Sequence, residues 1–82
     1  MTKHLKLVRV KWRDAKSEPS GWKSIEEIRN GKAALVSSVG WIIKETKKDL
    51  ILVSSIVDDH CDGDVIIPRD WVQSIEELTV KR

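Results

Sequence analysis

The chain has 82 residues, of which 40% are hydrophobic and 34% are charged, and its formal net charge is +2. These values predict one small folded domain over residues 1–82, because disordered chains have fewer apolar residues and a larger net charge. No apolar run reaches the roughly 18–20 residues that span a bilayer, and the first residues lack the apolar stretch of a signal peptide. The single cysteine, Cys61, excludes an internal disulfide, so we expect a cytoplasmic protein that does not bind membranes.

The first predicted strand covers residues 5–12, where apolar and basic side chains alternate. Val8 and Val10 fall on one face of such a strand, and Arg9 and Lys11 fall on the other. Basic residues are concentrated in this part of the chain. Between residues 1 and 23 they are Lys3, Lys6, Arg9, Lys11, Arg13, Lys16 and Lys23, against the acids Asp14 and Glu18. Such a surface favours an anionic partner.

A short helix is predicted over residues 24–30, after a loop that contains proline and glycine. Ser24 and Glu27 form a capping box, in which each side chain bonds the backbone amide of the other residue. Ile25 and Ile28 share one face of this helix. Because a helix of one or two turns is not stable alone, we expect these isoleucines to hold it against a sheet.

The centre of the chain predicts a hairpin of two long strands, residues 33–44 and 50–57, joined by the polar turn 45–49. Apolar residues occupy both faces of each strand, so we expect this hairpin, with Trp41, to be covered on two sides. Gly40 marks a bend or a close backbone approach. The predicted core residues are Val10, Val39, Ile43, Leu52 and Ile67.

The C-terminal part begins with a predicted polar loop, residues 58–64, followed by a short strand at 65–67 and a tight turn at 69–71. Residues 72–80 fit either a strand or a helix, because Trp71-Val-Gln-Ser-Ile-Glu-Glu-Leu nearly repeats Trp22-Lys-Ser-Ile-Glu-Glu-Ile. We favour a strand, since the preceding short strand needs a neighbour and tight connections usually join neighbours.

Candidate chemical sites are few. His60 and Cys61 could ligate zinc, but three or four suitably spaced protein ligands are required. The glycines are scattered, so no phosphate-binding loop is formed, and His60 and Cys61 lack a third partner that would orient a catalytic base. The sequence therefore predicts a protein with no metal, no cofactor and no enzymatic activity.

Tryptophans with basic neighbours form the most informative group of side chains. Indole rings stack on nucleobases, and arginine binds phosphate through two parallel hydrogen bonds. We therefore predict a ligand that is anionic and aromatic, a nucleotide or a short nucleic acid. The predicted ligand-binding residues are Arg9, Trp12, Arg13, Trp22, Arg69 and Trp71.

The order of the predicted elements resembles the small five-stranded Sm-like barrels, which include the bacterial RNA chaperone Hfq. The resemblance is carried by Gly40 to Leu52, a glycine in a bent strand followed by a polar turn and an apolar strand, and by Ile66 to Val72, two strands around a tight turn. It implies a small five-stranded barrel, so that the predicted fold is mainly β, an Sm-like barrel with the short helix inferred above between strands 1 and 2. It also implies RNA binding as one possible function.

Nearly the whole chain also resembles a family of short phage and prophage proteins that are mostly uncharacterised. The matching residues are Trp12 and Asp14, Gly21 and Trp22, Val39-Gly40-Trp41, and Ile67-Pro68-Arg69. The resemblance implies a phage-encoded protein in the host cytoplasm.

Together these features predict a non-catalytic accessory protein that self-associates and antagonises host defence by sequestering a nucleotide immune signal. Two alternatives stay open. One is an Sm-like RNA-binding protein, which should lose affinity steeply with salt as counterions are released. The other is a protein–protein interaction module that docks through a sheet edge.

Overall fold

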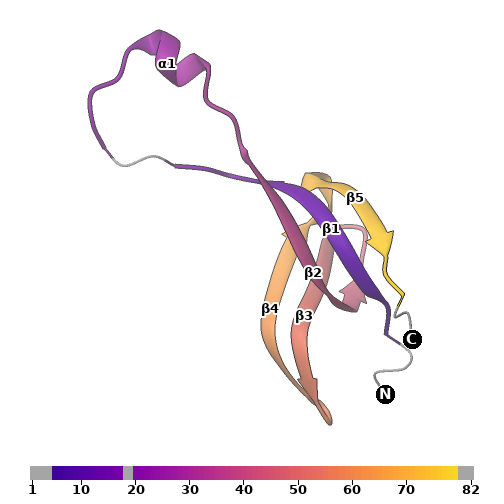
Figure 1. Ribbon diagram of the computed structural model, residues 1–82. Coiled ribbons are helices and arrows are strands. Elements are labelled where there is room, and N and C mark those ends of the chain that lie inside the picture. Colours follow the sequence, from indigo (N-terminus) through magenta and orange to yellow (C-terminus); the bar gives the residue numbers. More distant parts are fainter. Residues whose placement is uncertain (1–4, 18–19, 80–82) are drawn as a thin grey trace.

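The computed structural model describes residues 5–17 and 20–79 and contains one antiparallel sheet of five strands (Figure 1). The elements in chain order are β1 (Leu7–Asp14), α1 (Ile25–Arg29), β2 (Ala34–Glu45), β3 (Asp49–Val57), β4 (His60–Pro68), the 3₁₀ turn η2 (Arg69–Trp71) and β5 (Val72–Glu77). The prediction of a mainly β fold with one short helix between the first two strands is confirmed. None of the helices in the described ranges is long and apolar enough to cross a membrane.

The sheet is strongly curved but is not a closed barrel. Its strand order is β4-β3-β2-β1-β5, so β4 and β5 lie at opposite edges. The predicted closure into a barrel is therefore wrong. Closure would also require β4 to pair with β5, whereas the three-residue turn η2 after Pro68 leads the chain from β4 to β1, with which β5 pairs in the described structure.

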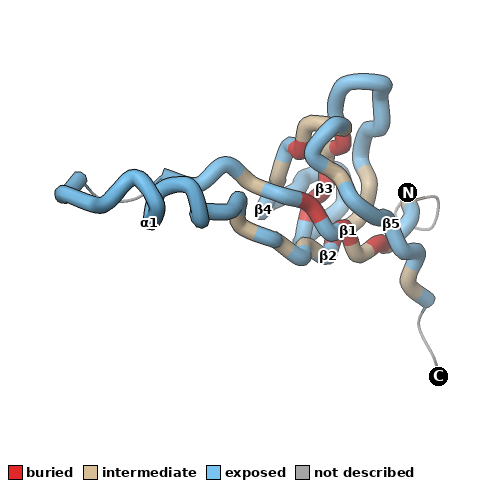
Figure 2. Tube along the Cα trace, turned by 90° about the horizontal axis from the view of Figure 1, so that it is seen from above, coloured by how far each residue is buried: buried red, intermediate tan, exposed pale blue. Residues whose placement is uncertain are grey.

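The core is formed by residues of β1, β3 and β4, and buried residues are found in the sheet (Figure 2). In β1, buried residues alternate with outward ones, as expected for a half-buried strand. The core cluster in the described part of the chain consists of Val8, Val10, Trp12, Leu50, Leu52 and Ile67. The predicted burial of Val10, Leu52 and Ile67 is confirmed, since each is at most 1% exposed.

The outer face of β2 is not covered, which corrects two of the predicted core residues. Val39 is 54% exposed and Ile43 is 42% exposed, whereas Val36 and Ile42 on the opposite face pack against the core. The expectation that the hairpin is covered on two sides is therefore wrong for β2, and Trp41 is only half-buried. The physical reason is that no second layer of the described structure packs on this face.

Gly40 lies in β2 close to the backbone of Val53 in β3. A Cβ atom at this position would lie 2.6 Å from the carbonyl oxygen of Val53, which is closer than real Cβ contacts allow. The sequence prediction of a close backbone approach at Gly40 is thus confirmed, and the absence of a side chain lets the two strands pack tightly.

The described residues between β1 and β2, 15–17 and 20–33, which we call the arm, extend away from the sheet with α1 near the far end (Figure 1). Helix α1 has the Ser24 half of the predicted capping box, as the Ser24 hydroxyl accepts a hydrogen bond from the Glu27 amide at 3.1 Å. The helix contains no buried residue, and Ile25 and Ile28 are 69% and 65% exposed. The prediction that these isoleucines hold the helix against the sheet is wrong, because the long connection carries it beyond reach of the core.

The acidic segment at residues 58–64 is mostly strand rather than loop. Only Asp58 and Asp59 form the turn, and β4 begins at His60, which pairs with Val57. Asp58 has a φ of 54°, a left-handed conformation that aspartate tolerates in turns. The predicted loop is wrong because β3 is long enough to provide hydrogen-bonding partners for the polar residues of β4.

The last described element confirms the favoured alternative for the C-terminal segment. Residues 72–77 form strand β5, paired with β1, and the predicted tight turn at 69–71 is the 3₁₀ turn η2. Val80 lies outside the described residues, as do Lys3 and Glu18 of the charged N-terminal part.

Candidate functional site

Trp12 and Trp71 lie against each other where β1 meets the beginning of β5. Their rings are stacked, with centroids 6.5 Å apart and planes inclined by 20°. The pairing explains this contact, because Trp12 is opposite Val72 and Trp71 directly precedes Val72 in the chain. Trp12 is 8% exposed and donates its indole N–H to the Ser38 hydroxyl at 3.0 Å.

Trp71 has a different environment from its partner. It is 39% exposed, so Trp12 forms a fixed support and Trp71 presents part of its ring to solvent. A supported, partly exposed indole is an arrangement on which a flat ring of a ligand can stack. The buried Trp12 ring therefore supports the Trp71 ring, and the partly exposed Trp71 ring forms a platform for stacking.

An open hollow of about 470 Å³ lies beside this platform, and we call it the tryptophan hollow. It is lined by Arg13, Asp14, Ala15, Ala33, Asp70, Trp71, Val72 and Gln73. Its volume falls within the range of small-molecule sites, roughly 300–1,000 Å³. One guanidinium, two carboxylates and one amide surround an aromatic surface, so the hollow offers hydrogen-bond donors and acceptors as well as a stacking partner.

Arg9 and Arg69 lie outside the tryptophan hollow and have acidic partners. The Arg9 guanidinium contacts the Glu76 carboxylate, with its Nε 2.9 Å from Oε1, across the β1–β5 pairing. The Nη1 atom of Arg69 lies 3.0 Å from Oε2 of Glu45, and the Arg69 amide donates to the Lys48 carbonyl at 2.8 Å. Both arginines therefore tie neighbouring segments of the sheet together, and neither lines the hollow.

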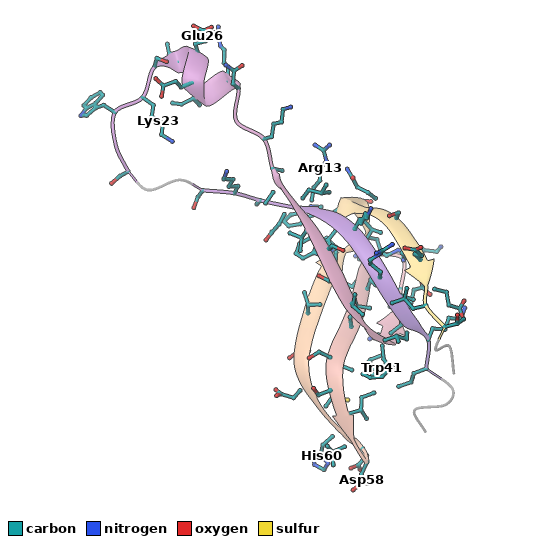
Figure 3. The ribbon with its side chains drawn as sticks, in the orientation of Figure 1. Arg13, Lys23, Glu26, Trp41, Asp58 and His60 are labelled. Atoms are coloured by element: carbon teal, nitrogen blue, oxygen red, sulfur yellow. The ribbon has the colours of Figure 1, made fainter. Side chains whose placement is uncertain are left out.

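Arg13 marks the base of the arm, whereas Lys23 and Glu26 lie far along it (Figure 3). Trp22, also in the arm, is fully exposed. The structure thus brings together three of the six predicted ligand-binding residues, Trp12, Arg13 and Trp71. It leaves Trp22 in the arm, apart from them.

A second hollow, of about 580 Å³, lies inside the arm itself. Its lining includes the basic residues Lys16, Lys23 and Lys32 together with Glu27 and Ile28. The net charge of these side chains is positive, so this surface attracts anions. It is a broad, exposed surface with no aromatic residue among its lining residues.

Within residues 5–17 and 20–79, no group of three or more histidine, cysteine, aspartate or glutamate side chains is placed to hold a metal ion. Cys61 is exposed, and His60 lies at the far end of the β3–β4 hairpin from Arg13 (Figure 3). Nδ1 of His60 is 2.8 Å from the Asp59 carboxylate. These two side chains therefore form a local surface contact.

Sequence reasoning missed several residues of this site. Asp70 and Gln73 line the tryptophan hollow, and Ser38 fixes the ring of Trp12. Asp70 and Gln73 flank Trp71 and Val72 in sequence, which is the one signal that was readable. Ser38 comes from β2, and only the pairing of Val10 with Ser38 brings it near Trp12.

Comparisons with protein-family models, with curated proteins and with solved structures gave no match for this chain. The resemblances to Sm-like barrels and to short phage proteins therefore stay predictions.

Proposed function

We propose that this protein is a non-catalytic binding protein that captures a nucleotide in the tryptophan hollow. The observation that carries the proposal is the stack of Trp71 on Trp12 beside Arg13. A base would stack on the exposed part of Trp71, and the Arg13 guanidinium would bind phosphate. Asp70 and Gln73 would bond the amino groups or ribose hydroxyls of the ligand.

The biological role in this proposal is that of a phage-type accessory protein in the cytoplasm of the infected cell. By holding a nucleotide immune signal without changing it, the protein would lower the concentration of free signal and so antagonise host defence. Support comes from the resemblance to short phage proteins and from a hollow that combines an aromatic platform with a guanidinium. We include self-association in this proposal, since an 82-residue domain has a small core.

The test is a titration of the protein with cyclic dinucleotides, cyclic ADP-ribose isomers and short RNAs, in which tryptophan fluorescence emission is the measured signal. A bound base is expected to quench emission. Arg13→Ala should weaken nucleotide binding about tenfold, since a charge-assisted hydrogen bond contributes about 1.5–3 kcal/mol. Lys47→Ala is the matched control, because it also removes one positive charge but lies in the β2–β3 turn and does not line the hollow.

Trp71→Ala should weaken binding about tenfold or more, because stacking contributes about 1–3 kcal/mol per base. Trp71 also covers Trp12, so this variant is compared with Trp71→Phe, which keeps an aromatic ring. A flat titration with all three ligand classes would contradict the proposal.

Single-stranded nucleic acid is the second candidate ligand, and a specific observation favours it. Outward-facing Lys11 and Arg13 on β1 lead into an arm that contains Lys16, Lys23 and Lys32. An extended strand bound along this path would lose affinity steeply with salt, because each neutralised phosphate releases counterions. A nucleotide held in the tryptophan hollow should show a much weaker dependence on salt.

A further inference from the structure

The arm carries an apolar surface that no described part of the chain covers. Trp22 and Ile25 are exposed there, and Glu26 follows Ile25 in the first turn of α1. Figure 3 shows Glu26 at the outer end of the arm and Lys23 on the inner side of the arm. We call Trp22, Ile25 and Glu26 the arm tip. An isolated helix of this length is not stable in water, so the arm tip requires a surface to pack against.

The sheet presents a surface of matching character on its outer side. Lys11 lies opposite Ser37, and the neighbouring pairs place Arg13 beside Leu35 and Arg9 beside Val39. Directly opposite residues of paired strands project from the same face. Leu35 is 66% exposed and Val39 is 54% exposed, so an apolar row runs alongside a basic row. We call these residues of β1 and β2 the outer face.

We propose that the arm tip of one copy packs on the outer face of a second copy, and that the second copy returns the same contact. The apolar residues Trp22 and Ile25 would cover Leu35 and Val39, and the Glu26 carboxylate would approach the ammonium group of Lys11. Each chain carries both surfaces, so a two-fold dimer contains two identical contacts. This dimer specifies the contact through which the self-association in the proposed function would occur. The observations that support it are separate from those that support nucleotide binding.

Three features of the chain favour a second copy as the occupant. The charges are complementary, as the arm tip carries a carboxylate and the outer face carries cations. The core cluster of the described residues contains six side chains, and small domains with small cores often gain stability by oligomerising. In addition, the arm extends away from its own sheet, and its described residues are exposed, which makes it accessible to another chain (Figure 1).

The experiment is a mixing test by sedimentation velocity from 1 to 200 µM (approximate range), with charge-reversed variants. Wild-type protein is expected to form dimers. Lys11→Glu and Glu26→Lys should each weaken dimerisation at least about tenfold, because like charges then oppose each other in both contacts. An equimolar mixture of these two variants should dimerise again, since each arm tip then meets an outer face of opposite charge.

Matched controls show whether these effects arise at this contact. Lys47→Glu makes the same charge change in the β2–β3 turn, away from the outer face, and should leave dimerisation unchanged. Ile25→Ser should weaken dimerisation while the circular dichroism spectrum of the sheet is retained. Emission of wild-type protein should shift to shorter wavelength with concentration, and Trp22→Phe should lose that shift.

Several results would overturn the proposal. One is a wild-type protein that stays monomeric over the whole range. Another is dimerisation that persists in both reversed variants, which would indicate pairing through the β4 or β5 edge. A third is failure of the mixture to recover, which would indicate an arm that docks elsewhere. The nucleotide titration is read separately, so a flat titration with intact dimers would count against the proposed ligand alone.

Discussion

Two segments of the chain with almost the same sequence adopt different secondary structures. Residues 24–28 read Ser-Ile-Glu-Glu-Ile and residues 74–78 read Ser-Ile-Glu-Glu-Leu. The first begins at the cap of helix α1 in the arm, and the second lies, up to Glu77, in strand β5 at the edge of the sheet. This contrast shows that the local sequence of each segment is compatible with both a helix and a strand.

The helical copy is held by local hydrogen bonds. The Ser24 hydroxyl accepts from the Glu27 amide, and the Ser24 carbonyl accepts from the Ile28 amide at 3.2 Å. The arm brings no described strand edge near this segment. Each of these bonds joins residues close in sequence, so the hydrogen bonds that define this segment are local and begin at the Ser24 cap.

The strand copy is held by β1. Ser74, Ile75 and Glu76 lie opposite Lys11, Val10 and Arg9, and the Leu78 amide donates to the Leu7 carbonyl at 2.8 Å. The turn η2 delivers this segment directly to the open edge of β1. A whole row of backbone hydrogen bonds, with an ion pair beside it, then outweighs the few bonds that a capping box provides.

The largest expected effect tests whether the sheet, and not the arm, holds the fold. Leu52→Ala should lower the free energy of unfolding by about 2–5 kcal/mol, because Leu52 is 1% exposed in the core. Ile28→Ala in the arm should change it by less than about 0.5 kcal/mol. Urea unfolding at about 1 µM protein measures both. Equal losses would show that the arm is part of the core.

A smaller loss is expected at the bend of β2. Gly40→Ala should cost about 1–3 kcal/mol, since the added methyl group meets the Val53 carbonyl and the two strands must separate. Gly21→Ala in the arm is the matched control, because a Cβ there has no atom within 4 Å. Thermal unfolding followed by circular dichroism distinguishes them. A Gly40→Ala variant as stable as Gly21→Ala would contradict the packing of β2 on β3.

The two matching glutamates provide a direct comparison between the segments. Glu76→Gln should lower the free energy of unfolding by about 0.2–1 kcal/mol, as it removes an exposed cross-strand ion pair with Arg9. The loss should disappear in 1 M salt (approximate), which screens such pairs. Glu26→Gln, at the equivalent place in α1, should have no measurable effect at low protein concentration. A loss at Glu26 equal to that at Glu76 would mean that the arm contributes to folding.

The smallest effect on global stability is expected at the two matching serines. Ser24→Ala removes a helix cap worth about 1 kcal/mol, so the Cα chemical shifts of residues 25–29 should move towards random-coil values. The melting temperature should stay unchanged, because α1 has no buried residue. Ser74→Ala should leave the shifts of α1 as they are. A fall in melting temperature for Ser24→Ala would contradict the independence of the arm.

Part of the candidate site could be predicted from the sequence. The sequence singled out Trp12, Arg13 and Trp71 because they place aromatic and basic groups near predicted strand ends, and the fold brings these three together. Arg9 and Arg69 were selected by the same reasoning, yet both have acidic partners from other segments. Such partners are distant in sequence, so only the strand register reveals them.

Patterns within short segments were enough to specify the mainly β fold, the positions of β1, β2 and β3, the capped helix and the glycine at the bend. These features depend on alternation, capping and backbone freedom, which act over a few residues. Three other features are decided only by the tertiary structure. They are the covered face of β2, the extension of the arm away from the sheet, and the strand conformation of residues 72–77. They depend on which segments become neighbours in space. No pattern within a single segment contains that information.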